Sequence, residues 1–155
     1  MQVEHLHRDE HGITLIIPHS KSDQEGKGRR VWLPFGKNPH RCPVSDLDAW
    51  IAAAHLTTGP IWREVNKADR LGAPLRRGER VNTIVSRLAA AARLPGAERY
   101  TGHSMRAGFI TAAAEAGATD REIANQSGHA PGSRSLHRYI RHNAAHTESA
   151  AGRVI

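Results

Sequence analysis

The residues with the clearest capacity for chemistry begin with a histidine and an arginine three positions apart, His103 and Arg106. They stand at the start of a predicted helix over 101–117, which Gly117 closes. Residues three apart share a helix face, and a helix N-terminus offers free N–H groups to an anion. An arginine there can donate two parallel hydrogen bonds to a phosphate. The pair indicates an anion site, although an isolated H-x-x-R is more often a solvated helix face.

A second histidine and a tyrosine follow further along the chain. His129 comes after a glycine that is predicted to end a helix, where a histidine is usually a polar loop residue. Tyr139 lies on a predicted helix over 133–143 that is rich in arginine. A tyrosine nucleophile needs nearby cations to favour the phenolate and to stabilise a crowded, phosphorane-like transition state. The simpler interpretation is a core tyrosine whose hydroxyl finds a hydrogen-bond partner.

The order H-x-x-R, Gly-His and Tyr is more specific than any of its parts. With this order, residues 101–109 (TGHSMRAGF), 121–129 (REIANQSGH) and 137–141 (HRYIR) resemble the catalytic box of the tyrosine recombinases, or phage integrase family. Residues 19–34 (HSKSDQEGKGRRVWLP) resemble that family's β-hairpin, which carries a lysine in an S-K-T-D-Q-like segment. Residues 42–51 (CPVSDLDAWI) resemble the helix that follows it, so the resemblance covers nearly the whole chain.

The resemblance implies a catalytic role for five residues. Tyr139 would attack a DNA phosphate, form a 3′-phosphotyrosyl link and release a 5′-hydroxyl. Arg106 would hold the non-bridging oxygens, and His103 would bind the phosphate and assist proton transfer to and from Tyr139. His129 would take the position that the family fills with His or Trp, and Lys21 would protonate the leaving 5′-oxygen. Neither a metal nor another cofactor is implied, because the phosphotyrosine conserves the bond energy.

The same resemblance implies the fold, the partners and the setting. The family's catalytic domain is helical, with a small three-stranded sheet at one side. Residues 1–155 would form one such domain of a site-specific recombinase or integrase, as part of a mobile element. Its partners would be double-stranded DNA and further copies of the chain on that DNA, in the cytoplasm of a bacterium or phage host, at the nucleoid.

Two departures from the family pattern bear on activity. The family has a further essential arginine on a helix ahead of the first strand; that position falls before Met1, and Arg8 is too close to the lysine to replace it. We therefore expect a partial catalytic domain, without the preceding helices and the core-binding domain, that is slow or inactive by itself. The second departure is one extra residue between His129 and Tyr139, at 130–132, which could move Tyr139 out of line for attack.

The charge balance independently favours a polyanionic partner. The chain of 155 residues has 22 basic and 15 acidic side chains, a net charge of +7 with histidine neutral. The single cysteine, Cys42, excludes an internal disulfide framework, and neither a signal peptide nor a membrane span is expected. Six clustered arginines are the candidate phosphate contacts: Arg76, Arg77, Arg80, Arg134, Arg138 and Arg141.

The pattern of elements predicts a mostly helical α+β fold, with strands first and helices after. The sequence predicts strands over 13–17 and 30–34, which form a β-hairpin with a long polar tip. Residues 2–6 are predicted to form a short strand before this hairpin. The alternation places Val31 and Leu33 inward, against Arg30 and Trp32. A core anchor is expected at Ile61, Trp62 and Val65, followed by a polar, basic loop over 67–78.

Capping patterns and apolar spacing predict the helices. Ser45 with Asp48 predicts the cap of a helix after Pro43, and Thr119 with Glu122 predicts a capping box for a short helix that stops at Gly128. A further helix is predicted where apolar residues recur at helical spacing: Val81, Ile84, Val85, Leu88 and Ala91.

Two alternatives stay open at the level of sequence. A zinc site could use His142 and His146 with His137 nearby, but no further ligand has suitable spacing, so solvated histidines on a DNA-facing helix are preferred. The other alternative is functional: a recombinase remnant that binds DNA or a partner subunit without cutting. The missing first arginine is what separates an enzyme from such a remnant.

Overall fold

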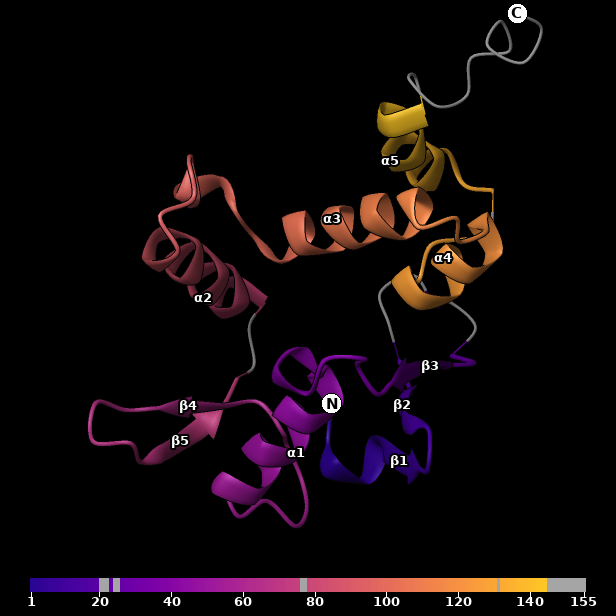
Figure 1. Cartoon of the computed structure of the whole chain (residues 1–155). Coiled ribbons are helices and arrows are strands. Elements are labelled where there is room, and N and C mark those ends of the chain that lie inside the picture. The colour runs from indigo at the N-terminus through magenta and orange to yellow at the C-terminus, as the bar shows by residue number, and fades with distance from the viewer. Residues whose placement is uncertain (20–22, 24–25, 76–77, 131, 145–155) are drawn as a thin grey trace, which may run out of the picture. The chain divides into compact units, whose positions relative to one another are not determined.

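The computed structural model divides into two compact units, Met1–Arg76 and Arg77–Ile155 (Figure 1). It describes residues 1–19, 23, 26–75, 78–130 and 132–144, with the backbone alone for 141–144. These parts contain five α-helices and two small antiparallel sheets, which confirms a mostly helical α+β protein. The expectation of one catalytic domain over 1–155 stays a prediction.

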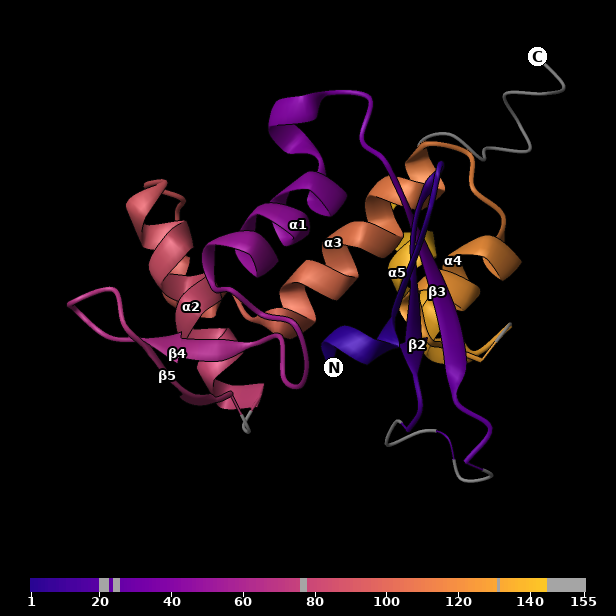
Figure 2. The same cartoon turned by 90° about the horizontal axis from the view of Figure 1, so that it is seen from below.

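A three-stranded antiparallel sheet opens the first unit. Its order is β1 (Leu6–Asp9), β2 (Gly12–Ile17) and β3 (Arg29–Pro34), and β2 and β3 lie side by side in Figure 2. The predicted hairpin strands are thus confirmed. Val31 is buried while Trp32 opposite Thr14 is exposed, as the alternation predicted.

The segment before this sheet differs from the prediction. Residues 2–6 do not form a strand: a 3₁₀-helix, η1 (Val3–His5), precedes β1. The tight turn from β1 to β2 depends on Asp9, whose Oδ1 accepts from the N–H of His11 at 2.8 Å and of Gly12 at 2.9 Å. A Cβ at Gly12 would collide with the carbonyl oxygen of Leu33 on β3, so only glycine fits there.

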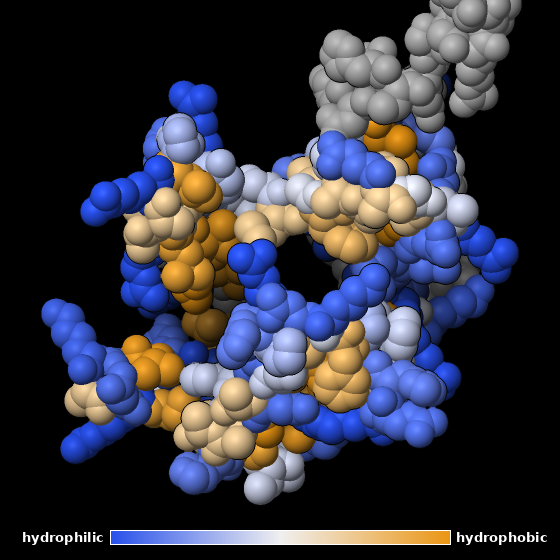
Figure 3. Space-filling model, viewed as in Figure 1, coloured by the Kyte–Doolittle hydropathy of each residue, from blue (hydrophilic) through white to orange (hydrophobic). Residues whose placement is uncertain are grey.

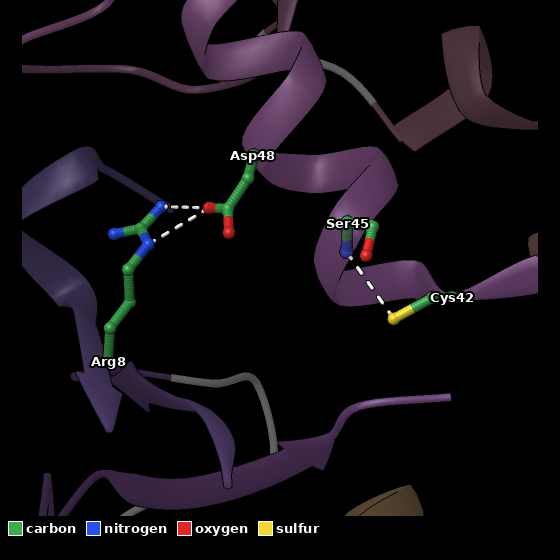
Figure 4. A network of polar contacts seen from close by, with 4 residues as sticks. All are labelled: Arg8, Cys42, Ser45 and Asp48. Atoms are coloured by element: carbon green, nitrogen blue, oxygen red, sulfur yellow. Dashed lines mark hydrogen bonds and ion pairs between the residues drawn. The ribbon is translucent and has the colours of Figure 1, made fainter. Parts of the chain in front are cut away.

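A helix follows the sheet, and its cap is not the one that the sequence predicts. After a short 3₁₀-helix, η2 (Pro39–Arg41), α1 (Pro43–Ala53) begins with Cys42 as its N-cap, whose Sγ accepts from the N–H of Ser45 at 3.5 Å (Figure 4). Asp48 instead pairs with Arg8 of β1, with 2.6 Å between Arg8 Nη2 and Asp48 Oδ1. The cap at Ser45 was wrong because Pro43, which lacks an N–H, suits the first helical position.

The end of the first unit holds a hairpin that the sequence did not predict. β4 (Arg63–Val65) pairs with β5 (Leu71–Pro74), where a loop over 67–78 was expected. Arg63 donates from Nε and Nη2 to the carbonyl oxygen of Gly72 at 3.0 and 2.8 Å, a contact across the strands. Of the expected core anchor only Ile61 is buried; Trp62 is 53% exposed and Val65 is exposed too. The buried core of this unit comprises Leu6, Ile13, Cys42, Val44 and Ile61.

The second unit is helical. α3 contacts α2, α4 and α5, and the last two lie against it in Figure 1. The buried core where α3, α4 and α5 meet consists of Ile110, Ile123, Ala124 and Leu136. The elements of this unit are α2 (Gly78–Ala91), η3 (Ala97–Arg99), α3 (Gly102–Glu115), α4 (Asp120–Ser127) and α5 (Arg134–Ala144).

The helix predicted from apolar spacing forms, but it does not bury its apolar face. Val81, Ile84 and Leu88 of α2 are all exposed, Leu88 by 59%. Figure 3 shows the corresponding apolar surface over α2. No helix among the described residues is both long enough and apolar enough to cross a membrane.

Candidate active site

Three helices of the second unit bring the predicted site residues together. α3 carries His103 and Arg106 in its first turns, α4 ends just before His129, and α5 carries Tyr139. All three helices meet at one core, so their ends hold fixed positions relative to one another.

Local sequence explains where α3 begins. Thr101 is its N-cap: its Oγ1 accepts from the N–H of Ser104 at 3.3 Å, and Ser104 Oγ accepts from the N–H of Thr101 at 3.2 Å. The N–H of Gly102 donates to Asn82 Oδ1 of α2 at 2.9 Å. These contacts satisfy donors of the first turn and fix the position of His103.

The end of α4 is set by an equally local pattern. The capping box predicted from Thr119 and Glu122 is confirmed, with Glu122 Oε2 accepting from the N–H of Thr119 at 2.7 Å. Gly128 ends the helix in the left-handed conformation, with φ of 75°. The chain therefore leaves α4 sharply, and His129 lies beside the helix end.

Tyr139 and His103 form the closest contact of the site. Tyr139 Oη lies 2.6 Å from His103 Nε2, and the two rings meet edge to face with centroids 5.9 Å apart. Tyr139 is half-buried, and His103 is exposed. A hydrogen bond of this length between a phenol and an imidazole allows a proton to pass between the two groups.

His129 lies on another side of the same tyrosine. Its ring centroid is 6.3 Å from that of Tyr139, again edge to face, and its Nδ1 lies 2.9 Å from Ser127 Oγ. Burial lowers the pKa of His129 below its usual 6.5, and the nearby charges of Arg106 and then His103 lower it further. The lowered pKa favours the neutral form of His129 at neutral pH.

Arg106 is exposed and near enough to His129 to affect its pKa. The structure thus gathers a phenol, a guanidinium and two imidazoles around one region of the second unit. This set can hold an anion, because the guanidinium and the imidazole N–H groups are all donors, and it can remove a proton from the phenol.

One extra residue between His129 and Tyr139 does not separate the tyrosine from His103. The described part of this loop makes its own turn, with Ser133 N–H donating to the Ala130 carbonyl at 3.1 Å. Ser133 Oγ then accepts from the N–H of Leu136 at 3.4 Å, at the start of α5. Pro131 lies outside the described residues.

The structure describes only some of the remaining residues that the sequence predicted to act in catalysis or DNA binding. Lys21, Arg76 and Arg77 lie outside the described residues, as does the side chain of Arg141 in α5. Arg80 on α2 and Arg134 and Arg138 on α5 are exposed. Their contacts with DNA stay a prediction.

The described residues give no support to the alternative zinc site. His137 Nδ1 lies 3.4 Å from Asp120 Oδ2, which links α5 to the first turn of α4. Within the part of the chain that the structure describes, no three His, Cys, Asp or Glu side chains gather as metal ligands. The side chain of His142 and all of His146 lie outside that part.

Two contributors to the site were missed by reasoning from the sequence. Ser127 comes before a Gly-His pair in the sequence, and nothing in that pattern shows that its hydroxyl contacts the ring two residues later. Asn82 was missed altogether, since its contact with Gly102 joins two helices 20 residues apart. The Asn82 contact depends on tertiary structure, whereas the Ser127 contact depends on the turn geometry at Gly128.

Comparison with known proteins supports the resemblance seen in the sequence. No protein-family model matches the chain. The chain is 29% identical over 154 residues to a protein of Selenomonas ruminantium described as an integrase/recombinase xerD homolog. The match covers 99% of this chain and 45% of that relative, so the chain spans less than half of the relative's length. Similarity along nearly the whole chain to an integrase/recombinase supports a relationship with the tyrosine recombinases.

Proposed function

We propose that this protein is a catalytic part of a site-specific DNA recombinase or integrase, which cuts and rejoins strands through a 3′-phosphotyrosine at Tyr139. The similarity to an integrase/recombinase along 99% of the chain supports this class of activity. The whole recombination reaction, including the choice of DNA site and assembly as a homo-oligomer on DNA, belongs to the proposal.

In the proposed cleavage step, Tyr139 Oη attacks the phosphorus and its proton passes to His103 Nε2. The bond from phosphorus to the 5′-oxygen breaks as the tyrosyl bond forms, and Lys21 donates a proton to that oxygen. Arg106 and His129 stabilise the charge on the non-bridging oxygens. Rejoining is the reverse step with the 5′-hydroxyl of another strand, so the chemistry requires neither ATP nor a metal.

The observation that carries the proposal is the 2.6 Å contact between Tyr139 Oη and His103 Nε2. A phenol is a weak nucleophile at neutral pH until a base removes its proton. His103 Nε2 already contacts the phenol oxygen and can accept that proton. His129 supports the same chemistry, because a neutral imidazole still donates one hydrogen bond to a phosphate oxygen.

Charge supports DNA as the substrate. The net charge of +7 favours a polyanion, and Arg134 and Arg138 are exposed on the helix that carries Tyr139. Since they are four residues apart, they share a face of α5 and suit successive backbone phosphates. The proposed activity places the protein with DNA in the cytoplasm of a bacterium or of a phage-infected cell.

The experiment uses a pool of duplexes of randomised sequence, each labelled at the 5′ end of the strand to be cut and nicked a few nucleotides downstream. After cleavage the short fragment before the nick diffuses away, so even slow cleavage accumulates as a covalent complex. We expect the 155-residue chain to accumulate labelled covalent complex only slowly, as a band that survives a denaturing gel.

The matched variants assign the nucleophile. Tyr139→Phe should abolish the covalent complex while DNA binding persists, because only the hydroxyl is removed. Tyr100→Phe is the control, since Tyr100 is a tyrosine of the same unit that directly follows η3. A complex that survives Tyr139→Phe contradicts the assignment, and binding without any covalent complex in the unmodified chain favours a remnant that does not cut.

A further inference from the structure

Ser127 combines burial with a contact to the candidate site. It is the only buried polar residue among those that the structure describes, with 5% of its surface exposed. Its hydroxyl oxygen lies 2.9 Å from Nδ1 of His129. Burying a hydroxyl without a partner costs free energy, and the imidazole nitrogen supplies that partner.

The position of Ser127 makes this contact rigid. It is the last residue of α4, and only Gly128 separates it from His129. Gly128 has φ of 75°, a conformation that returns the chain beside the helix end. Ile123 and Ala124, one turn earlier, are fully buried in the core shared with α3 and α5.

The tautomer of His129 decides what this ring offers to a ligand. A neutral imidazole has one N–H donor and one lone pair, and the hydrogen bond at Nδ1 determines which of them Nε2 presents. A lone pair at Nε2 would repel a phosphate oxygen, whereas an N–H would bind it. Arg106 already makes this region attractive to an anion, so a donor is the useful form.

We propose that Ser127 is a positioning residue: its hydroxyl donates to Nδ1 of His129 and thereby holds the Nε2–H tautomer, which leaves an N–H donor for a phosphate oxygen. The part concerning phosphate rests on the proposed function. The part concerning the tautomer is independent of it and can be tested on the free protein.

The first test reads the tautomer directly. Long-range ¹H–¹⁵N correlation spectra of the ¹⁵N-labelled chain distinguish protonation at Nδ1 from protonation at Nε2, and His129→Gln assigns the signals. We expect the Nε2–H form of His129 in the unmodified chain and a mixture of tautomers in Ser127→Ala. Ser86→Ala is the control, because the Ser86 hydroxyl of α2 donates to the Thr83 carbonyl in its own helix. An Nδ1–H form in the unmodified chain, or a tautomer that Ser127→Ala leaves unchanged, overturns the proposal.

The second test links the tautomer to rate, using thymidine 3′-(p-nitrophenyl phosphate) as a small activated phosphodiester. Attack by Tyr139 forms the tyrosyl–phosphorus bond and expels p-nitrophenolate, which needs no proton donor. We expect Ser127→Ala to slow this step roughly threefold to tenfold, the effect of one hydrogen bond, and Ser127→Thr to restore it.

A double-mutant cycle separates positioning from a general structural role. If Ser127 acts through His129, Ser127→Ala should cause no further loss in the His129→Gln background. Equal losses in both backgrounds would mean that the serine only stabilises the fold, which overturns the proposal. An unmodified chain that does not react with the ester contradicts the proposed function, while the tautomer measurement still decides the role of Ser127.

Discussion

Arg106 is the residue of the candidate site whose hydrogen-bonding geometry no other side chain can reproduce. A guanidinium donates two parallel hydrogen bonds to a phosphate, whereas the ammonium of lysine is a point charge. We expect Arg106→Lys to slow formation of the covalent DNA complex by a factor on the order of 10²–10³, the effect of losing one donor to the transition state. The rate of accumulation on nicked duplexes measures this. Arg121→Lys, an exposed arginine of α4, is the control, and an equal loss there would contradict a specific role for Arg106.

The lowered pKa of His129 predicts that the free energy of unfolding falls as the pH falls. The folded chain binds the proton less readily than the unfolded chain, whose histidine titrates near 6.5. As pH falls below that value, the unfolded state takes up more protons and the folded state loses stability; above it this residue contributes no pH dependence. We expect His129→Gln to flatten the fall in urea midpoint between about pH 7 and about pH 5. An unchanged slope would show that His129 is not buried as described.

At the scale of single residues, the sequence could predict which side chains meet but not how they are held. The order of His103, Arg106, His129 and Tyr139 was sufficient to choose four side chains that the structure brings together. The contact of Ser127 with His129 depends on the turn geometry after Gly128 and on burial, and neither is visible in a single sequence.

Short capping patterns determine where the helices of the second unit begin. The capping box of α4, formed by Thr119 and Glu122, can be tested by single substitutions. Thr119 Oγ1 accepts from the N–H of Glu122 at 3.3 Å. We expect Thr119→Ala to lower the free energy of unfolding by about 1 kcal/mol, and Thr119→Ser to retain most of it. Urea denaturation followed by circular dichroism measures both. Equal losses in the two variants would mean that the methyl group of Thr119, and not its hydroxyl, stabilises α4.

Helices and strands could be predicted where residues close together in the sequence determine them, and not where distant residues do. The Thr119 and Glu122 box lies within four residues, and it was confirmed. The cap of α1 was misplaced because Cys42 satisfies the N–H groups of both Gly36 and Ser45, a role that a thiol seldom takes. The side chain of Ser45, and after it the N–H groups of Gly36 and Ser45, lower the pKa of Cys42 to about 7. The β4–β5 hairpin was not predicted because apolar and polar residues do not alternate along its two strands.

At the scale of the whole molecule, the net charge of +7 predicts salt-dependent binding to DNA. Each phosphate contact adds roughly −0.9 to the slope of log affinity against log salt. We expect weak and largely non-specific binding, and the double variant Arg134→Ala, Arg138→Ala should reduce the slope by about 2. Fluorescence anisotropy on a labelled duplex over a salt series measures both. Binding that does not change with salt would contradict contact through backbone phosphates.

Covalent attachment of Tyr139 to a 3′-phosphate is the step that defines the proposed reaction. Thymidine 3′-(p-nitrophenyl phosphate) tests it most directly, because its reaction depends neither on a DNA sequence nor on Lys21. We predict a slow, single-turnover release of p-nitrophenolate and a thymidine 3′-phosphoryl adduct, which mass spectrometry of peptides assigns to Tyr139. The adduct should persist in Tyr100→Phe and be absent from Tyr139→Phe. No adduct in the unmodified chain, or an adduct on another residue, would show that Tyr139 is not the nucleophile.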